Sequence, residues 1–273
     1  MTLKARGLIL DLFGDYLRYA DAEARLSHLT ELLGAFDIAP ATVRVTLSRL
    51  RREGWFVTRR DGRETIYALT PDILGVLDEG RDRIFAPPAD RWAGVWTVVI
   101  YQMTESERQE RIQLRKSLAW HGFGPLTTST WLSPGDRRKE VRELVDQSTE
   151  EQVDVLSCMS EGPEHDRVLA RRCWDLEALA SQYSEFNDEH RHLLREARRL
   201  TGAGALVART ELISTYRHFP FRDPRLPPEL RPEPWPGVES YEIFRSAHAR
   251  LGDAARAYVA GVIGRELPET PLP

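Results

Sequence analysis

Apolar residues recur at three- and four-residue steps in the first part of the chain, a spacing typical of helices packed on one face. They predict a first helix at about residues 6–18 and a second at about 23–35. A third helix is expected to begin at Pro40 and end at Gly54, because proline suits the first helical turn and glycine suits a helix end. Its N-cap would be Ala39, which is a poor capping residue.

Beyond the third helix the hydrophobic period changes to that of strands. Residues 55–57 and 64–69 read as two short strands, with residues 59–63 between them. The dipeptide Asp61-Gly62 is a strong signal for a hairpin turn. Helix, helix, sharp turn, helix and hairpin together predict a winged helix-turn-helix.

The middle of the chain alternates between strand and helix patterns. A helix at about 71–85 and a proline-containing linker at 86–89 separate it from the first part. The order strand, helix, strand, helix, strand would become a split ferredoxin-like unit with one further strand. The five predicted elements lie at about 95–101, 105–120, 127–132, 137–147 and 153–158.

The last part of the chain is mainly helical. Helices are predicted at about 166–200, 203–218 and 240–262, with a proline-rich connection at 219–236. The fold class is therefore expected to be α+β, with three domains. These are a winged helix-turn-helix DNA-binding domain at 1–88, a ferredoxin-like middle domain at 89–163, and a helical C-terminal effector and dimerisation domain at 164–273.

Composition narrows the classes of protein. The chain has 273 residues, of which 41% are hydrophobic, as in ordinary globular proteins. No apolar run reaches the roughly 20 residues of a membrane span, and charges interrupt the first 18 residues, so we expect no signal peptide and a cytoplasmic location. Cys158 and Cys173 have no partners at zinc-like spacing, so we expect reduced thiols and no metal site.

The charge is distributed unevenly. The whole chain has a formal net charge of -4, yet residues 42–63 contain seven arginines and two acids, a local net charge of +5. A helical wheel places the buried residues of the third helix opposite an arc of small residues and arginines, as a recognition helix in a major groove requires. The predicted DNA-binding residues are Ala41, Thr42, Arg44, Val45, Ser48, Arg49 and Arg52, with Arg59, Arg60 and Arg63 of the hairpin.

Two other interpretations of this basic segment stay open. Arg51, Arg52 and Glu53 alone are often a solvated helix face, and three helices with a hairpin also occur in dimerisation modules. A winged-helix RNA-binding or protein-interaction module without a small-molecule effector is the alternative to a DNA-binding repressor.

Distinctive segments occur in order along nearly the whole chain. The most distinctive is Tyr-Arg-His-Phe-Pro-Phe-Arg-Asp-Pro at 216–224. Through these segments the chain resembles the PaaX family of bacterial repressors of phenylacetate degradation. The others lie at 8–16, 42–50, 53–55, 96, 111–118, 122–124, 131–134, 173–176, 226–230 and 235–237.

The resemblance implies a homodimeric transcriptional repressor of a catabolic operon, with the three domains given above. It also implies binding to double-stranded operator DNA and release by an aryl-coenzyme A thioester such as phenylacetyl-CoA. The middle domain of the family is similar to a CRISPR adaptation nuclease fold, in which a carboxylate at the end of the first strand holds metal. Here Gln102 and Met103 follow Tyr101, which argues against a nuclease. We expect no enzymatic activity and no cofactor.

A CoA thioester needs an aromatic slot for its acyl group and cations for its phosphates. A cluster near the C-terminal segments could supply both, although aromatic residues more often fill cores. Arg108, Arg111 and Arg115 share one helix face as a possible phosphate patch or, more simply, a solvated face. His190 and His192 point apart at i, i+2, unlike a helical zinc pair. The predicted effector-binding residues are Trp174, Tyr216, Arg217, His218, Phe221 and Trp235.

Overall fold

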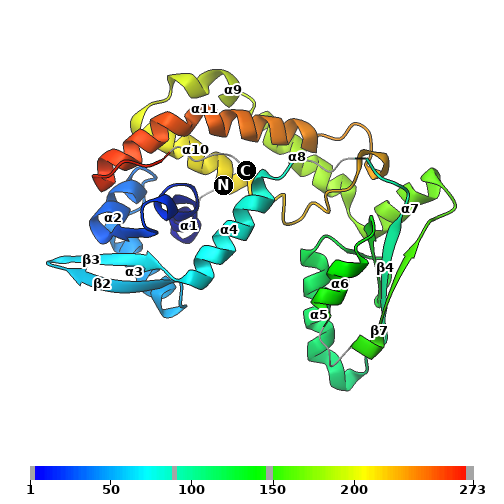
Figure 1. Cartoon of the computed structure of the whole chain (residues 1–273). Coiled ribbons are helices and arrows are strands. Elements are labelled where there is room, and N and C mark those ends of the chain that lie inside the picture. Colours follow the sequence, from blue (N-terminus) through cyan, green and yellow to red (C-terminus); the bar gives the residue numbers. More distant parts are fainter. Residues whose placement is uncertain (1–3, 88–90, 146–149, 269–273) are drawn as a thin grey trace. The chain divides into compact units, whose positions relative to one another are not determined.

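The chain is mixed α/β, with two antiparallel sheets. The computed structural model describes residues 4–87, 91–145 and 150–268. Contacts divide the chain into two compact units, each of which is described by itself (Figure 1). Unit 1 contains Met1–Ala86, Phe186–His218 and Glu239–Pro273, and unit 2 contains Pro87–Glu185 and Phe219–Val238. The C-terminal segment expected at 164–273 is therefore shared between the two units.

The N-terminal part of unit 1 combines helices with a three-stranded sheet of order β1-β3-β2 (Figure 1). Both strand pairs in this sheet are antiparallel. The elements are α1 (Ala5–Asp15), the 3-10 turn η1 (Leu17–Tyr19), β1 (Glu23–Arg25), α2 (Leu26–Gly34), α3 (Pro40–Arg52), β2 (Phe56–Asp61), β3 (Glu64–Leu69) and α4 (Pro71–Phe85).

Two expectations for this region were wrong in detail. The second helix begins at Leu26, because Glu23–Arg25 pairs with β3 as a strand after a turn in which Asp21 and Ala22 have positive φ. Pairing with a neighbouring strand here overrides local helix preference. The hairpin arginines Arg59 and Arg60 lie within β2 rather than in a loop.

The hairpin and the third helix have the ends that their turn residues favour. Gly62, with φ 59°, and one further residue connect the paired Asp61 and Glu64. Helix α3 begins at Pro40 without a side-chain cap from Ala39, as the sequence predicted. It ends at Arg52, two residues before the expected end.

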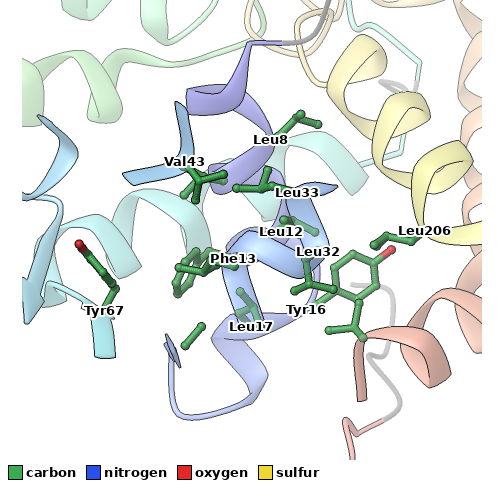
Figure 2. Packing of buried hydrophobic residues seen from close by; sticks show 14 of the residues in the cluster. Leu8, Leu12, Phe13, Tyr16, Leu17, Leu32, Leu33, Val43, Tyr67 and Leu206 are labelled. Atoms are coloured by element: carbon green, nitrogen blue, oxygen red, sulfur yellow. The ribbon is translucent and has the colours of Figure 1, made fainter. Parts of the chain in front are cut away.

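One hydrophobic core joins the N-terminal elements of unit 1 to helices from the far end of the sequence. Figure 2 shows Leu206 of α10 (Gly202–Tyr216) in the same cluster as Leu12 and Tyr16 of α1. Leu251 and neighbours in α11 (Gly237–Ile263) complete it. A fully buried leucine stabilises the fold by about 1.5–3 kcal/mol, so this core holds α1 firmly against α10 and α11.

Unit 2 is built on a four-stranded antiparallel sheet of order β5-β6-β4-β7 (Figure 1). Helices α5 and α6 pack on one face of this sheet, and α7 packs on the other. The elements are β4 (Trp96–Tyr101), η2 (Glu105–Glu107), α5 (Arg108–Trp120), β5 (Gly124–Pro125), β6 (Thr130–Pro134), α6 (Arg138–Leu144), η3 (Glu150–Gln152), β7 (Val153–Cys158) and α7 (Pro163–Cys173).

Three expectations for these residues need correction. The fourth strand of the sheet is β5, which is only two residues long. The strand expected at 127–132 forms at Thr130–Pro134, because Leu126 N donates to Thr130 O and closes a turn first. The helix expected at 137–147 ends at Leu144, and residues 146 and 147 lie outside the described residues.

The long helical stretch expected at 166–200 is divided. Trp174 has extended backbone angles, and Asp175 Oδ1 accepts a hydrogen bond from Ala178 N, which starts a new helix. The following elements are α8 (Leu176–His190), α9 (Leu193–Glu196) and η4 (Ala197–Arg199), and η5 (Pro228–Leu230) lies in the proline-rich connection. No helix among the described residues combines the length and apolar character needed to cross a bilayer.

Candidate nucleic-acid interface

Helix α3 has one buried side and one exposed side. Val43, Leu47 and Leu50 are fully buried in the core of unit 1, which fixes the rotation of the helix about its axis. Val45 on the opposite side is 69% exposed, which is unusual for an apolar side chain. The predicted DNA-binding residues of α3 are all exposed except Ser48, which is half-buried: Ala41, Thr42, Arg44, Val45, Ser48, Arg49 and Arg52.

The strand hairpin extends this basic surface. Phe56 is buried at its base, where its ring lies 5.0 Å from Phe13 and 6.0 Å from Tyr67 between ring centroids. From Val57 onward every residue of β2 is exposed. The structure therefore places Arg59, Arg60 and Arg63 in solvent on a hairpin whose first strand contacts α3.

Two arginines of this surface have acidic partners that are also partly in solvent. Arg49 Nε lies 2.9 Å from Glu53 Oε1, and Arg6 Nη1 lies 2.5 Å from Glu53 Oε2. The hydrogen bond from Arg6 is the main reason that the pKa of Glu53 lies below its usual value. Arg59 Nη2 lies 2.7 Å from Glu23 Oε1.

The other arginines of the surface are more open to a ligand. Within the described ranges, Arg44, Arg52, Arg60 and Arg63 form no ion pair. Exposed ion pairs are weak in water, so a phosphate group can replace Glu23 or Glu53 as the partner of an arginine. The surface is thus chemically suited to a polyanion.

A buried ionic cluster holds α1, on which α3 packs. Asp15 Oδ2 lies 3.3 Å from Arg209 Nε of α10, and Asp15 Oδ1 lies 3.1 Å from His248 Nε2 of α11. Burial alone would raise the pKa of Asp15, but Arg209 and then His248 outweigh burial and lower it to about 2. Burial lowers the pKa of His248, so neutral His248 donates from Nε2 to Asp15 while Nδ1 faces Arg209 Nη2 at 3.5 Å.

A second carboxylate of α1 behaves differently. Asp11 Oδ1 lies 2.9 Å from Arg217 Nε, but its Oδ2 is buried without a hydrogen-bond partner. Burial therefore dominates and raises the pKa of Asp11 to about 6, although Arg217 opposes the shift. Neither acid was predicted from the sequence to have a role, and their i, i+4 spacing within an apolar helix was the available signal.

The predicted effector-binding residues are divided between the two units. In unit 1, Tyr216 stacks on Phe244 with ring centroids 4.1 Å apart, and Arg217 pairs with Asp11. His218 is exposed. Tyr216 and Arg217 thus have roles in the packing of unit 1 that require no ligand.

The remaining three lie in unit 2 and pack on three different aromatic partners. Trp174 stacks near Trp96 with ring centroids 6.5 Å apart. Phe221 tilts over Trp120 at 5.1 Å, and Trp235 meets the edge of Tyr183 at 5.8 Å. Close packing on Trp174 also explains Gly124, because a Cβ there would lie 2.5 Å from the indole.

Other candidates from the sequence are placed as follows. Arg111 pairs with exposed Glu105, and the Arg115 guanidinium lies 6.0 Å from the Trp131 ring centroid. His190 is buried against Phe186, whereas His192 is exposed. Within the described part of the chain, no group of histidines, cysteines and acids is arranged to hold a metal ion.

Comparison with known proteins assigns every part of this architecture to one family. The profile described as PaaX-like protein matches residues 4–73, the PaaX protein central Cas2-like domain matches 89–170, and the PaaX-like protein C-terminal domain matches 174–261. A curated relative, the transcriptional repressor PaaX of Escherichia coli (strain K12), is 29% identical over 283 residues, covering 100% of this chain and 88% of that protein.

A solved structure has the same fold over most of its length. It is the uncharacterized protein Rv0674 from Mycobacterium tuberculosis, with a TM-score of 0.56 and 26% identity, covering 92% of this chain and 98% of that chain. These matches identify the class of protein as a regulator and not an enzyme. The chain belongs to the PaaX family.

Proposed function

We propose that the protein is a sequence-specific DNA-binding transcriptional repressor of a catabolic operon. The observation that carries this proposal is the exposed face of α3, where arginines and small residues lie opposite a fully buried apolar side. In the proposal, α1 to α3 and the β2–β3 hairpin form a winged helix-turn-helix, and α3 enters the major groove as the recognition helix.

Each part of this surface has a chemical role in the proposal. Arg49 and Arg52 can donate two hydrogen bonds to guanine, and exposed Val45 can contact a thymine methyl group. Ala41, Thr42 and Ser48 are small enough for close approach to bases. The hairpin residues Arg59, Arg60 and Arg63 bind phosphates or the neighbouring minor groove, which positions the domain.

The proposal includes three functional segments and a homodimer. The segments are the DNA-binding domain at 1–88, a ferredoxin-like middle domain at 89–163 and a C-terminal effector and dimerisation domain at 164–273. The strand order β5-β6-β4-β7 with two helices on one face supports the ferredoxin-like assignment. A two-fold dimer would bind two half-sites of a palindromic operator.

We further propose that an aryl-CoA thioester such as phenylacetyl-CoA releases the protein from its operator. The proposal rests on membership of the PaaX family and on the aromatic and basic residues of the C-terminal segments. Exposed His218 and half-buried Trp174, Phe221 and Trp235 are better placed to meet a ligand than buried Tyr216 or paired Arg217.

A titration of purified protein with a duplex from upstream of its own gene tests the proposal, with a scrambled duplex as competitor and salt held constant. The result we expect is specific binding that phenylacetyl-CoA weakens and acetyl-CoA does not. Specific binding that ignores both thioesters would contradict the effector assignment alone. Preference for single-stranded RNA over any duplex would contradict the repressor.

A further inference from the structure

The two faces of the sheet in unit 2 are covered to different extents. On one face, Val99 and Tyr101 of β4 lie in a closed core with residues of α5 and α6. On the other face, Trp96 is buried but Val98 is only half-buried, and Leu156 of β7 is 51% exposed. Helix α7 covers part of this second face.

A cavity of about 420 Å³ lies where α7 leaves the second face of the sheet uncovered. That volume is near the small end of the roughly 300–1,000 Å³ typical of ligand sites. Apolar side chains form most of its wall, and its mouth contains the exposed thiol of Cys158. The apolar wall consists of Trp96, Val98, Leu126, Leu132, Met159 and Leu169.

The aromatic side of the cavity is fixed in place. Trp96 Nε1 donates to Asp166 Oδ1 over 2.7 Å, a buried hydrogen bond that locks the indole. Trp92 meets the Trp96 ring edge-on at 5.1 Å, and Trp174 stacks near it at 6.5 Å. A rigid indole presents a flat apolar surface to which a second aromatic ring can pack at low entropic cost.

One polar atom in the cavity wall lacks a partner. His165 Nδ1 is buried without a hydrogen bond, and Glu161 Oε2 lies 3.8 Å away, beyond hydrogen-bond range. A buried, unpaired nitrogen is unfavourable, and an oxygen acceptor on a ligand would satisfy it by accepting from Nδ1–H. The cavity thus combines a flat apolar wall with one hydrogen-bonding position.

We propose that this cavity binds a single aryl ring that has a carbonyl or carboxylate group, with the ring against Trp96 and the oxygen at His165. The inference rests on the proposed function in taking the aryl group to be that of the effector. The same chemistry occurs in a free arylcarboxylate and in its CoA thioester, whose longer part would extend through the open mouth.

Alkylation of the native protein by iodoacetamide, followed by intact mass measurement, tests this occupancy without DNA. Cys158 is exposed and should be labelled, whereas burial raises the pKa of Cys173 to about 12 and should keep it unlabelled. We expect saturating phenylacetyl-CoA to slow labelling at least fivefold and acetyl-CoA to leave it unchanged. Protection by phenylacetate as well would identify the ring and its acid as the recognised part, and protection by the thioester alone would identify the thioester as the source.

Paired variants on α7 locate the effect. Leu169→Trp fills the cavity and should abolish protection, while Val168→Trp, an exposed neighbour outside the cavity wall, should keep it. His165→Ala should raise the concentration needed for protection about tenfold, which keeps the test decisive if Leu169→Trp does not fold.

Three results would overturn the inference: no protection by either aryl probe, protection that survives Leu169→Trp, or Cys158 that is unreactive in free protein because a second copy covers this face. Operator binding is measured separately. Protection without operator release would contradict the proposed function and leave the cavity assignment standing.

Discussion

Unit 1 uses the same chemical pair, arginine with a carboxylate, in two opposite settings. On the hairpin surface, Arg59 and Glu23 lie 2.7 Å apart with side chains 56% and 27% exposed. In the interior, Arg209 and Asp15 lie 3.3 Å apart with side chains only 3% and 6% exposed. The shorter distance belongs to the weaker pair, because water screens the surface charges and no water reaches the buried ones.

The comparison separates what positions the candidate site from what binds. Loss of one partner in the interior leaves a charge that water cannot reach, so Asp15 and Arg209 fix α1 against α10. Loss of one partner on the surface costs little, so Arg59 and Arg49 can exchange a carboxylate for a phosphate. The proposed DNA-binding surface thus has exchangeable charges on a support with fixed charges.

The largest effect is expected from breaking the interior pair. Asp15→Asn keeps the shape of the side chain but leaves Arg209 charged and uncompensated, which should lower the free energy of unfolding by about 3–5 kcal/mol. Urea denaturation followed by circular dichroism at pH 7 measures the loss. Asp21→Asn, in an exposed pair with Arg265, is the control and should cost less than about 1 kcal/mol. Equal losses in the two variants would refute the distinction.

Asp11 sharpens the comparison through pH. Its pKa is raised from 3.8 to about 6, so its contribution to stability is present below pH 4 and lost as pH rises through 6. A shift of this size corresponds to about 3 kcal/mol. The unfolding free energy of Asp11→Asn should therefore rise relative to wild type by this order between pH 4 and pH 7. A difference that is constant with pH would show that Asp11 is not the titrating group.

On the surface, the expected change is in binding and not in stability. Arg49→Ala should weaken operator binding by about 1–3 kcal/mol and relax sequence choice at one base pair if Arg49 contacts a base. Arg51→Ala removes the same charge from the edge of α3 and is the matched control. Titration against operators with single base-pair changes separates the two variants. Identical, sequence-independent losses would mean that α3 contacts only phosphates.

The smallest effect is expected from releasing a surface arginine. Glu23→Gln removes the partner of Arg59, and such exposed pairs contribute about 0–1 kcal/mol. Operator affinity should rise by up to about fivefold, with unchanged unfolding free energy. Fluorescence anisotropy of a labelled duplex at fixed salt can resolve this change. A clear loss of affinity would indicate that Glu23 orients Arg59 instead of competing for it.

The sequence predicted those elements whose signals are local. The proline at the start of α4 and the alternation in β3 and β7 located these elements at the observed bounds. Strand β1 was missed because it depends on pairing with β3, more than forty residues away. Strand β5 was missed because two residues have no measurable period.

The same limit applies to the candidate sites. The face of α3 follows from helical periodicity, so Val43, Leu47 and Leu50 were correctly expected to be buried. The aromatic residues near the C-terminus were grouped by closeness in sequence, and the fold assigns Tyr216 and Trp235 to different units. Their grouping as one effector site stays a prediction.

Selection from a random duplex library tests the central claim most directly, because the operator sequence emerges from the selection itself. The account predicts enrichment of a palindromic sequence, specific binding that weakens steeply with salt, and loss of preference at one position in Arg49→Ala. Enrichment of no sequence by the folded wild-type protein, or enrichment that Arg49→Ala and Arg52→Ala leave unchanged, would contradict α3 as the recognition helix.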